Sequence, residues 1–388
     1  MKILLVHCHY RLPGGEDAVF AAERAMLERH GHEVLVYERS NEEAAHGLPK
    51  ALLPLHAVWN RAAARDVKRI IQTKNVDAVH IHNTLLLLSP AVVRAAKRTG
   101  VPVVQTLHNF RLFCPNGILL RGGQVCEDCP RHGLACAVRH RCYRGSLAQT
   151  LVVAAAYGLH RLLGTWRGVT MVALTEFDRR KLLEFNRLHP MFDADRLVVK
   201  PNPVCVPDGP VTPWENRKNQ MLFAGRLEEL KGLRTVLEAW RLLGDAAPTL
   251  LVAGEGPLGD WARAQNLPNV RFLGQLSRAE LHARMAESRA VVAASLCYES
   301  FALVPAEAHA LGTPVLASDL GNVGASVQPG VDGLRFTPGD ANALAGAVRA
   351  LGQMRFDCNA IAARARRTYS EEENYNALMR FYTKGTTK

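Results

Sequence analysis

The sequence predicts an α/β protein of two doubly wound domains, each a parallel sheet covered by helices. Three observations support this fold class. The chain has 388 residues, more than one typical domain holds. Short apolar segments, bounded by polar or glycine-bearing loops, alternate with helical segments along both halves. A proline-rich stretch, 201–210, separates the two series and is typical of an interdomain connection.

The predicted elements follow from apolar periodicity and from glycine or proline boundaries. In the first half we expect the strands Lys2–His7, Val34–Tyr37, Val76–His82, Val101–Leu107, Thr170–Leu174 and Val198–Pro201. Between them we expect the helices Ala18–His30, Leu85–Arg98 and Leu147–Leu163. In the second half we expect the strands Met221–Ala224, Thr249–Ala253, Val270–Leu273, Ala290–Ala294 and Pro314–Ala317, with helices starting near Phe301 and near Glu371.

Charge is unevenly distributed along the chain. The formal net charge is +12, and residues 1–200 hold 28 Lys and Arg against 17 Asp and Glu. Residues 131–175 contain six arginines and no acid. Such a basic half favours an anionic partner, which could be a membrane surface, a phosphorylated acceptor or nucleic acid; a solvated basic face that aids solubility is the alternative. No recognition helix or aromatic-rich strand motif supports the nucleic-acid interpretation.

Localisation is predicted from what the sequence lacks. It has no run of eighteen apolar residues, so no membrane span is predicted. Its start runs directly into a strand pattern and lacks a secretory signal, which predicts a cytoplasmic protein. The apolar helix Leu147–Leu163 has basic flanks, so it either rests on an anionic membrane surface or is buried in the first domain.

Two carboxylates, Glu299 and Glu307, stand eight positions apart around the predicted start of a helix. Glu299 is expected in the preceding loop and Glu307 about two turns into the helix, roughly on one side. Free N–H groups at a helix start bind phosphate, while carboxylates bind hydroxyls. This combination predicts a site for a sugar nucleotide.

The stretch resembles the E-x7-E signature of retaining GT-B glycosyltransferases, in particular glycosyltransferase family 4. Three further motifs match in the expected order: Gly14-Gly15, the segment from Gly225 to Gly232, and Val252-Ala-Gly-Glu-Gly-Pro257. The resemblance implies two Rossmann-like domains facing a central cleft. It implies an acceptor-binding domain at 1–200 with a cysteine-rich insertion at 111–145, a nucleotide-sugar domain at 201–370, and a helix at 371–388 that crosses back to the first domain.

The resemblance also implies roles on the donor side. Arg226 and Lys231 would contact the pyrophosphate, Glu299 the transferred sugar and Glu307 the ribose. A surface salt bridge from these cations to Glu228 or Glu229 is the alternative. Gly254 and Gly256 would shape a turn at the cleft floor. Backbone groups of the helix start would add donors, from Ser300, Phe301, Ala302 and Leu303; many relatives have glycine where this chain has Ala302, which a negative φ would tolerate.

On the acceptor side, Gly14 and Gly15 let backbone N–H groups approach a phosphate or sugar. Asp17 is expected to cap the following helix. His108 ends a strand where family members place a histidine near the reacting sugar. His7, His9, His80 and His82 also lie at strand ends, but no third-ligand pattern joins them, so a catalytic metal is not expected.

Five cysteines cluster between residues 114 and 142. In a cytoplasmic chain such a cluster favours metal over disulfides. The Cys126-x-x-Cys129 spacing is typical of tetrahedral zinc, with Cys114 and Cys142 completing a structural site. Cys136, His132 and His140 are substitutes for the outer ligands, and buried free thiols are the alternative.

We therefore expect a retaining hexosyltransferase that uses a nucleotide-diphosphate sugar and needs no catalytic cofactor. A basic acceptor domain suggests a saccharide or lipid-diphosphate-linked glycan acceptor, as in surface polysaccharide biosynthesis. The alternatives are a nucleotide-sugar epimerase of the same build and a catalytically silent partner subunit.

Overall fold

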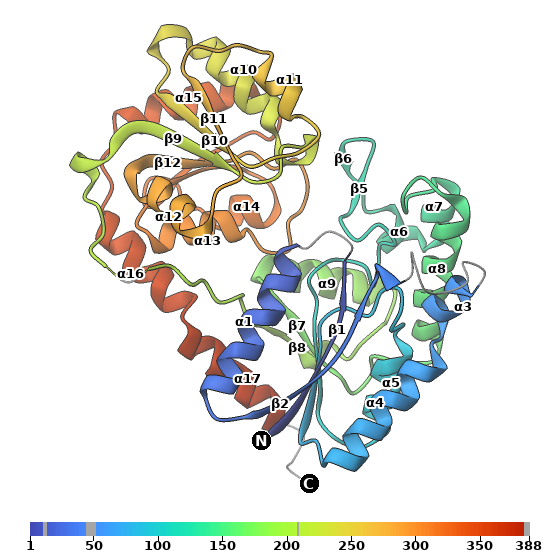
Figure 1. Cartoon of the computed structure of the whole chain (residues 1–388). Helices are drawn as coiled ribbons and strands as arrows, with labels where there is room; N and C mark the ends of the chain where they lie inside the picture. Colours follow the sequence, from blue (N-terminus) through green and yellow to red (C-terminus); the bar gives the residue numbers. More distant parts are fainter. Residues whose placement is uncertain (11–13, 44–51, 208, 384–388) are drawn as a thin grey trace. The chain divides into compact units, whose positions relative to one another are not determined.

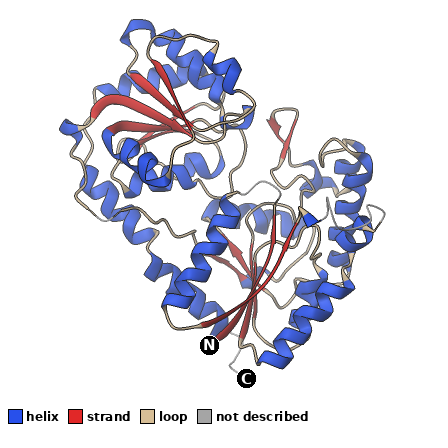
Figure 2. Ribbon diagram, viewed as in Figure 1, coloured by secondary structure: helices blue, strands red, loops and turns tan. Residues whose placement is uncertain are grey.

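The computed structural model describes residues 1–10, 14–43, 52–207 and 209–383, and it divides the chain into two compact units. The first unit comprises residues 1–121, 126–203 and 371–388, and the second comprises 122–125 and 204–370. Each unit has its own parallel sheet and its own helices (Figures 1 and 2).

The sheet of the first unit has six parallel strands. In spatial order they are β2 (Glu33–Ser40), β1 (Lys2–His9), β3 (Ala78–Ile81), β4 (Val103–Thr106), β7 (Thr170–Ala173) and β8 (Leu197–Val199). The central strands are buried along their whole length, as their continuous apolar runs predict.

Helices and one short 3-10 turn (η1, Ala194–Arg196) connect these strands. The helices are α1 (Gly15–Arg29), α3 (Leu53–Val58), α4 (Arg61–Lys74), α5 (Ala91–Lys97), α6 (Asp128–His132), α7 (Ala135–Arg139), α8 (Leu147–Leu162), α9 (Glu176–Leu188) and α17 (Glu371–Thr383). One face of the sheet packs its apolar side chains against α1 and α17. The core there joins Ile3 and Leu5 of β1 to Phe20 of α1 and to Leu378 and Phe381 of α17.

Two predicted helix boundaries in this unit are wrong. The helix expected at 85–98 begins only at Ala91, because Pro90 cannot donate to a preceding turn and Ser89 has a positive φ of 55°. The helix expected at 18–30 begins at Gly15. There Asp17 in the first turn accepts a hydrogen bond from the Gly14 amide at 2.8 Å, as its expected capping role requires.

The second sheet also has six parallel strands. In spatial order they are β11 (Val270–Gly274), β10 (Thr249–Ala253), β9 (Lys218–Ala224), β12 (Ser288–Ala293), β13 (Val315–Ser318) and β14 (Gly333–Phe336). Strand β14 has no counterpart in the sequence prediction. Its four residues begin with glycine and include Arg335, so its apolar run is too short to stand out.

The helices of this unit cover both faces of the sheet (Figure 2). They are α10 (Leu233–Leu243), α11 (Gly259–Arg263), α12 (Arg278–Glu287), α13 (Leu303–Ala310), α14 (Gly321–Ala325), α15 (Ala341–Gly352) and α16 (Cys358–Thr368), with 3-10 turns η2 (Trp214–Asn216), η3 (Glu229–Lys231) and η4 (Gly244–Ala246). Strand alternation divides the core in two. Phe223 and Val252 face α10 and α15, whereas the adjacent Leu222 and Leu251 face α12, α13 and α14.

A small hairpin, β5 (Leu120–Arg121) and β6 (Gln124–Val125), lies inside the cysteine-rich insertion. Its turn is Gly122-Gly123, with φ of 58° and 78°. Two consecutive positive φ values match the twist of a two-residue hairpin. The Gly122-Gly123 pair therefore indicates a turn, although the strands on either side are too short to be predicted.

Candidate functional site

Each sheet has one switch point, where the chain reverses the direction in which it adds strands. In the second sheet the chain runs from β9 outward through β10 to β11, and then from β12 outward through β13 to β14. The loops after the adjacent strands β9 and β12 therefore diverge, and ligands of open α/β sheets bind at such switch points. Arg226 and Lys231 follow β9, and Glu299 follows β12.

Lys231 and Glu299 meet at this switch point. The Lys231 ammonium donates to a Glu299 oxygen at 2.8 Å, although 68 residues separate them. The same oxygen accepts a hydrogen bond from Ser295. Burial alone would lower the pKa of Lys231, but the Glu299 carboxylate outweighs it and raises that pKa, which keeps the ammonium charged. Two predicted donor-side residues thus form one ion pair that remains partly open to solvent.

Arg226 lies near the same loop and is more exposed. Its guanidinium is 3.5 Å from Glu228, with 55% of the side chain exposed. Glu229 instead accepts from Arg234 at 2.8 Å. The salt-bridge alternative therefore describes Arg226 only, and an exposed pair of this kind contributes little stability.

Glu307 occupies a different position from the one expected. Helix α13 begins at Leu303, so Glu307 lies just over one turn into the helix and Glu299 lies outside it. Its side chain is buried and accepts from Arg278 at 3.0 Å, and His282 lies 3.5 Å away. A neighbouring cation holds a buried carboxylate in one orientation, and a sequence pattern cannot reveal Arg278 as that cation.

The segment that leads into α13 is fixed by side-chain contacts. Asn322 donates to the carbonyls of Glu299 and Ser300, at 2.5 and 3.1 Å. The Phe301 ring lies edge-on to Tyr369 with 5.7 Å between centroids. Ala302 has a φ of −81°, which tolerates the methyl group that replaces the glycine of many relatives.

Glycines allow the loop after β10 to pack directly on the loop after β9. Gly254 has a φ of 129°, and a Cβ there would lie 2.0 Å from the Gly225 carbonyl oxygen. A Cβ at Gly256 would lie 2.5 Å from the Leu227 carbonyl oxygen. Both glycines are therefore needed for backbone packing beneath the Arg226 loop.

The first sheet has its switch point between β1 and β3. Gly14 and Gly15 follow β1, and a Cβ at either would meet no atom within 4 Å among the described residues. Described neighbours therefore do not require glycine at these two positions.

Asp17 joins two of the strand-end histidines. One carboxylate oxygen lies 2.9 Å from His7 Nε2 and 2.9 Å from His9 Nδ1. The sequence pattern offers no third group for these histidines, and the structure supplies Asp17. Because Asp17 already accepts from both rings and from Gly14, hydrogen bonding accounts for the arrangement without a metal.

His108 is half-buried beside β4, and its Nε2 lies 3.0 Å from Nδ1 of the buried His82. Both rings line a small cavity of about 20 Å³, enough for one water molecule, which Arg111 and Tyr157 also line. Burial, reinforced by His82, lowers the pKa of His108 well below its usual value. The ring is therefore neutral at neutral pH.

Sequence reasoning missed Glu23, which lies fully buried on α1. Its carboxylate is 2.6 Å from the Lys200 ammonium, with His80 and His82 close by. Glu23, His80 and His82 could together offer three metal ligands. The Lys200 charge already neutralises the carboxylate, which disfavours a cation there. Glu23 lies on the same face of the helix as Val19, Phe20 and Leu27, so its burial could have been predicted from the sequence. Its partners could not.

The five clustered cysteines are free thiols in the structure. Burial and the neighbouring Cys114, Cys142 and Cys136 together raise the pKa of Cys129 to about 12. They are thus close enough to interact. Within the described residues, no three of these sulfurs all lie within 4.8 Å of one another.

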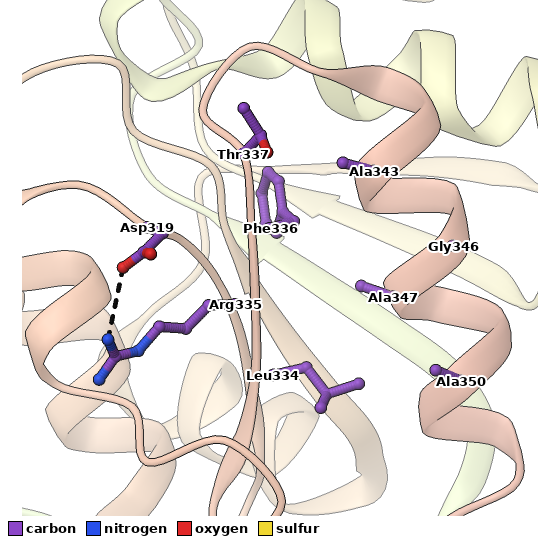
Figure 3. Close-up of a pocket in the computed structure, with 9 residues that line it drawn as sticks. All are labelled: Asp319, Leu334, Arg335, Phe336, Thr337, Ala343, Gly346, Ala347 and Ala350. Carbon is purple, nitrogen blue, oxygen red and sulfur yellow. Dashed lines mark hydrogen bonds and ion pairs between the residues drawn. The ribbon is translucent and has the colours of Figure 1, made fainter.

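A separate groove of about 440 Å³ lies between β14 and α15 of the second unit (Figure 3). Asp319 and Arg335 form a 3.4 Å ion pair at its side, and small residues of α15 form the opposite wall. The described residues that line it include none of the predicted site residues.

Solved structures share this architecture over almost the whole chain. A sucrose-phosphate synthase from Thermosynechococcus elongatus aligns with a TM-score of 0.68 and 16% identity, covering 99% of this chain and 98% of its own. The Anabaena protein HepE in complex with UDP aligns with a TM-score of 0.64 and 17% identity, covering 99% of this chain and 100% of its own. The lipopolysaccharide outer core galactosyltransferase WaaB aligns with a TM-score of 0.65 and 14% identity, covering 98% of this chain and 99% of its own. At these identities the likeness shows the fold alone, which is the GT-B fold of glycosyltransferases.

The family follows from the sequence matches. A model described as Glycosyltransferase Family 4 matches residues 13–206, half of the chain, and one described as Glycosyl transferases group 1 matches residues 218–353. The chain belongs to glycosyltransferase family 4, which confirms the resemblance found in its motifs.

Most of the similar characterised proteins align with only part of this chain. The chain is 40% identical over 139 residues to a glycogen synthase of Mycobacterium tuberculosis, covering 34% of this chain and 33% of that protein. It is 34% identical over 171 residues to a phosphatidyl-myo-inositol mannosyltransferase of Mycobacterium leprae, covering 42% and 46%. It thus spans less than half the length of these two. An uncharacterized glycosyltransferase of Methanocaldococcus jannaschii is 24% identical over 379 residues, covering 89% and 87%.

Proposed function

We propose that the protein is a retaining glycosyltransferase that moves a hexose from a nucleotide-diphosphate sugar to a saccharide or lipid-linked glycan acceptor, as in surface polysaccharide biosynthesis. In this proposal the second unit binds the donor and the first binds the acceptor. The observation that carries it is the Lys231–Glu299 pair at the switch point of the second sheet. It offers a cation for a diphosphate and a carboxylate for sugar hydroxyls in one place.

The chemistry follows from charge development. As the bond from the sugar to the diphosphate breaks, negative charge gathers on the leaving oxygen, and Arg226 and Lys231 stabilise it electrostatically. Double displacement would need a carboxylate on the face opposite the leaving group. The matched motifs supply no such residue, so the proposal favours front-face attack with the leaving phosphate taking the acceptor proton. Retention of anomeric configuration in the product, measured by NMR, checks this route.

The first test is thermal stabilisation by a panel of nucleotide diphosphates and their sugars. A ligand that binds only the folded protein raises Tm. Lys231→Ala should abolish the shift given by the true donor. Lys218→Ala is the matched control, because Lys218 lies at the opposite end of β9 in an exposed pair with Glu287. Equal shifts in both variants would contradict the proposed donor site.

Product analysis separates the remaining alternatives. An epimerase converts the nucleotide sugar without an acceptor, whereas a transferase releases the nucleotide diphosphate only when an acceptor is present. A silent partner subunit would give no thermal shift with any nucleotide sugar. UDP and its sugars are tried first, because a protein of the same fold was solved with UDP.

The proposal includes contact with an anionic membrane through α8. Leu147, Leu151, Leu159 and Leu162 recur at helical spacing and are 38–84% exposed. Arginines flank the helix, and residues 131–175 carry no acid. An apolar stripe edged by arginines suits a surface of anionic lipid, in line with a lipid-linked acceptor. No helix in the described ranges is long and apolar enough to cross a membrane.

Vesicle flotation tests this contact. Vesicles that contain phosphatidylserine should bind the protein and release it in high salt, whereas neutral vesicles should bind it weakly. Leu162→Asp should weaken binding. Leu242→Asp, at another exposed leucine, on α10 of the second unit, should not. Vesicle binding that is the same for anionic and neutral lipids, and is unchanged in Leu162→Asp, would contradict the contact.

The proposal also assigns a structural zinc to Cys114, Cys126, Cys129 and Cys142. The support is their proximity. Burial raises the pKa of both Cys129 and Cys142, negative charge on the neighbouring sulfurs raises it too, and a bound divalent cation would oppose both effects. The sulfurs would have to draw together on binding. Zinc would order the loops of the insertion and take no part in transfer.

Metal content of the purified protein tests the assignment. We expect about one zinc per chain by elemental analysis, lost in Cys129→Ser and kept in Cys205→Ser. Cys205 is an exposed free cysteine of the second unit, outside the cluster. A wild-type protein without zinc after expression in zinc-supplemented medium would reject the assignment.

A further inference from the structure

A buried polar series in the first unit leads from Glu23 to His108. Glu23 is fully buried and bonds the Lys200 ammonium through Oε1 at 2.6 Å. Its other oxygen, Oε2, lies 3.4 Å from His82 Nε2. Burial alone would raise the pKa of Glu23, but Lys200 and His82 outweigh it and lower the pKa well below its usual value. Glu23 is therefore a carboxylate and can only accept hydrogen bonds.

The series continues through His82. The opposite ring nitrogen of His82, Nδ1, lies 3.0 Å from His108 Nε2. His82 is 3% exposed, whereas His108 is half-buried and lines a cavity beside Arg111. The order is thus carboxylate, imidazole, imidazole, from the core toward the surface.

With both imidazoles neutral, only one set of protons suits every contact in this series. A neutral imidazole carries one N–H, and between His82 and His108 there is room for one proton. If His82 held its proton on Nδ1, the lone pair of Nε2 would face the Glu23 carboxylate in a buried setting. With the proton on Nε2, His82 donates toward Glu23 and its Nδ1 accepts from His108. His108 is then protonated on Nε2, and its Nδ1 carries a lone pair.

We propose that Glu23 and His82 are positioning residues that hold His108 in the Nε2–H form, so that His108 Nδ1 serves as a hydrogen-bond acceptor for a hydroxyl of the acceptor substrate. The use of Nδ1 by a substrate rests on the proposed function; the proton arrangement does not. No proton is transferred to Glu23. The carboxylate acts on the substrate only through the orientation of two rings, as such partners act on metal-bound and catalytic histidines.

His80 provides an internal comparison. Its Nδ1 lies 3.5 Å from the same Glu23 oxygen, so it shares the carboxylate with His82. Its own hydrogen bonds go to Tyr382 and Thr106, both at 2.8 Å, and not to His108. If the network merely held α1 and α17 to the sheet, replacing His80 or His82 would have the same kind of effect.

The test is long-range proton–nitrogen NMR of the His108 ring in the full chain, which reports which nitrogen is protonated. We expect the Nε2–H form in the wild type, a mixture of both forms in His82→Phe, and the unchanged Nε2–H form in the control His80→Phe. Because Glu23→Gln would leave Lys200 buried without a counter-charge, the second variant is the pair Glu23→Gln with Lys200→Met. It should also lose the single form of His108.

A wild-type His108 protonated on Nδ1, or a His108 that keeps one form in His82→Phe, would overturn the inference. Once a transferase assay exists, His82→Phe should raise the KM for acceptor about as much as His108→Phe, and His80→Phe should not. If the spectra follow expectation but no transfer is found with any sugar donor, the proposed function fails and the proton arrangement stands. If the KM for acceptor does not respond, the substrate contact is rejected.

Discussion

Single residues in this protein are held by partners far away in the sequence. Lys231 finds Glu299 across 68 positions, Glu307 finds Arg278, and Glu23 finds Lys200 across 177. The motifs predicted site roles for Lys231, Glu299 and Glu307, because spacing and residue type identify them. They could not predict the partners, since a partner depends on which strands become neighbours. Glu23 belongs to no motif at all and emerges only from packing.

At Gly254 the backbone conformation itself sets the residue type. Gly254→Ala should lower the free energy of unfolding by at least ~1–3 kcal/mol, because its φ of 129° is strained for alanine and the Cβ would meet the Gly225 carbonyl. Gly346→Ala is the control. Gly346 lies inside α15 with no described atom within 4 Å of a Cβ, so alanine should stabilise by about 0.5–1 kcal/mol. Urea denaturation measures both, and a neutral Gly254→Ala would contradict the close packing of the two loops.

Buried histidines should make the protein sensitive to acid. Burial lowers the pKa of His160 from 6.5 to about 4, against the opposing hydrogen bond to the Val58 carbonyl. The unfolded chain therefore takes up a proton at a higher pH than the folded one. The contribution of His160 is complete above about pH 6.5 and is lost as the pH falls toward 4, by up to ~3 kcal/mol.

His160→Gln should make the decline of stability between pH 6.5 and pH 4 shallower. Gln72→Ala, at an exposed residue of α4 that does not titrate, is the control and should leave the slope unchanged. Chemical denaturation at a series of pH values measures the slope. A steeper decline in His160→Gln would mean that the ring is protonated in the folded protein.

At the scale of elements, prediction depended on local signals. Strands with continuous apolar runs were predicted within a few residues, and β10 with its exact bounds of Thr249–Ala253. The helix expected from Leu85 begins only at Ala91. The prediction followed the apolar residues 85–88 and gave too little weight to Ser89 and Pro90, which disfavour a helix. The start of α13 was placed two residues early, since no capping side chain marks it. The hairpin and β14 are too short for periodicity to be visible.

Helix α17 illustrates how an element far along the chain completes a core. Phe381 packs with Ile3, Phe20 and Leu378 and is 7% exposed. Phe381→Ala should destabilise the first unit by about 3–5 kcal/mol, through lost burial and a residual cavity. Asn376→Ala, on the exposed side of the same helix, should change stability by less than about 0.5 kcal/mol. Equal effects would mean that α17 does not pack as described.

At the scale of the whole molecule, the two sheets have separate apolar cores. The second unit is nearly continuous in sequence, 204–370, and contains Arg226, Lys231, Glu299 and Glu307. We expect this fragment, made alone, to fold and to bind the same nucleotide diphosphate as the full chain. Circular dichroism and calorimetry measure the two properties. A folded fragment without nucleotide binding would mean that the first unit contributes to the donor site.

The first unit, in contrast, is assembled from segments on both sides of the second. During translation, residues 204–370 leave the ribosome before 371–383, so the apolar face that awaits Leu378 and Phe381 stays uncovered in the interval. At usual synthesis rates this lasts on the order of ten seconds or more. A nascent chain would therefore expose a ready chaperone-binding surface on its earliest-made part, and this exposure would end only when its last helix is synthesised.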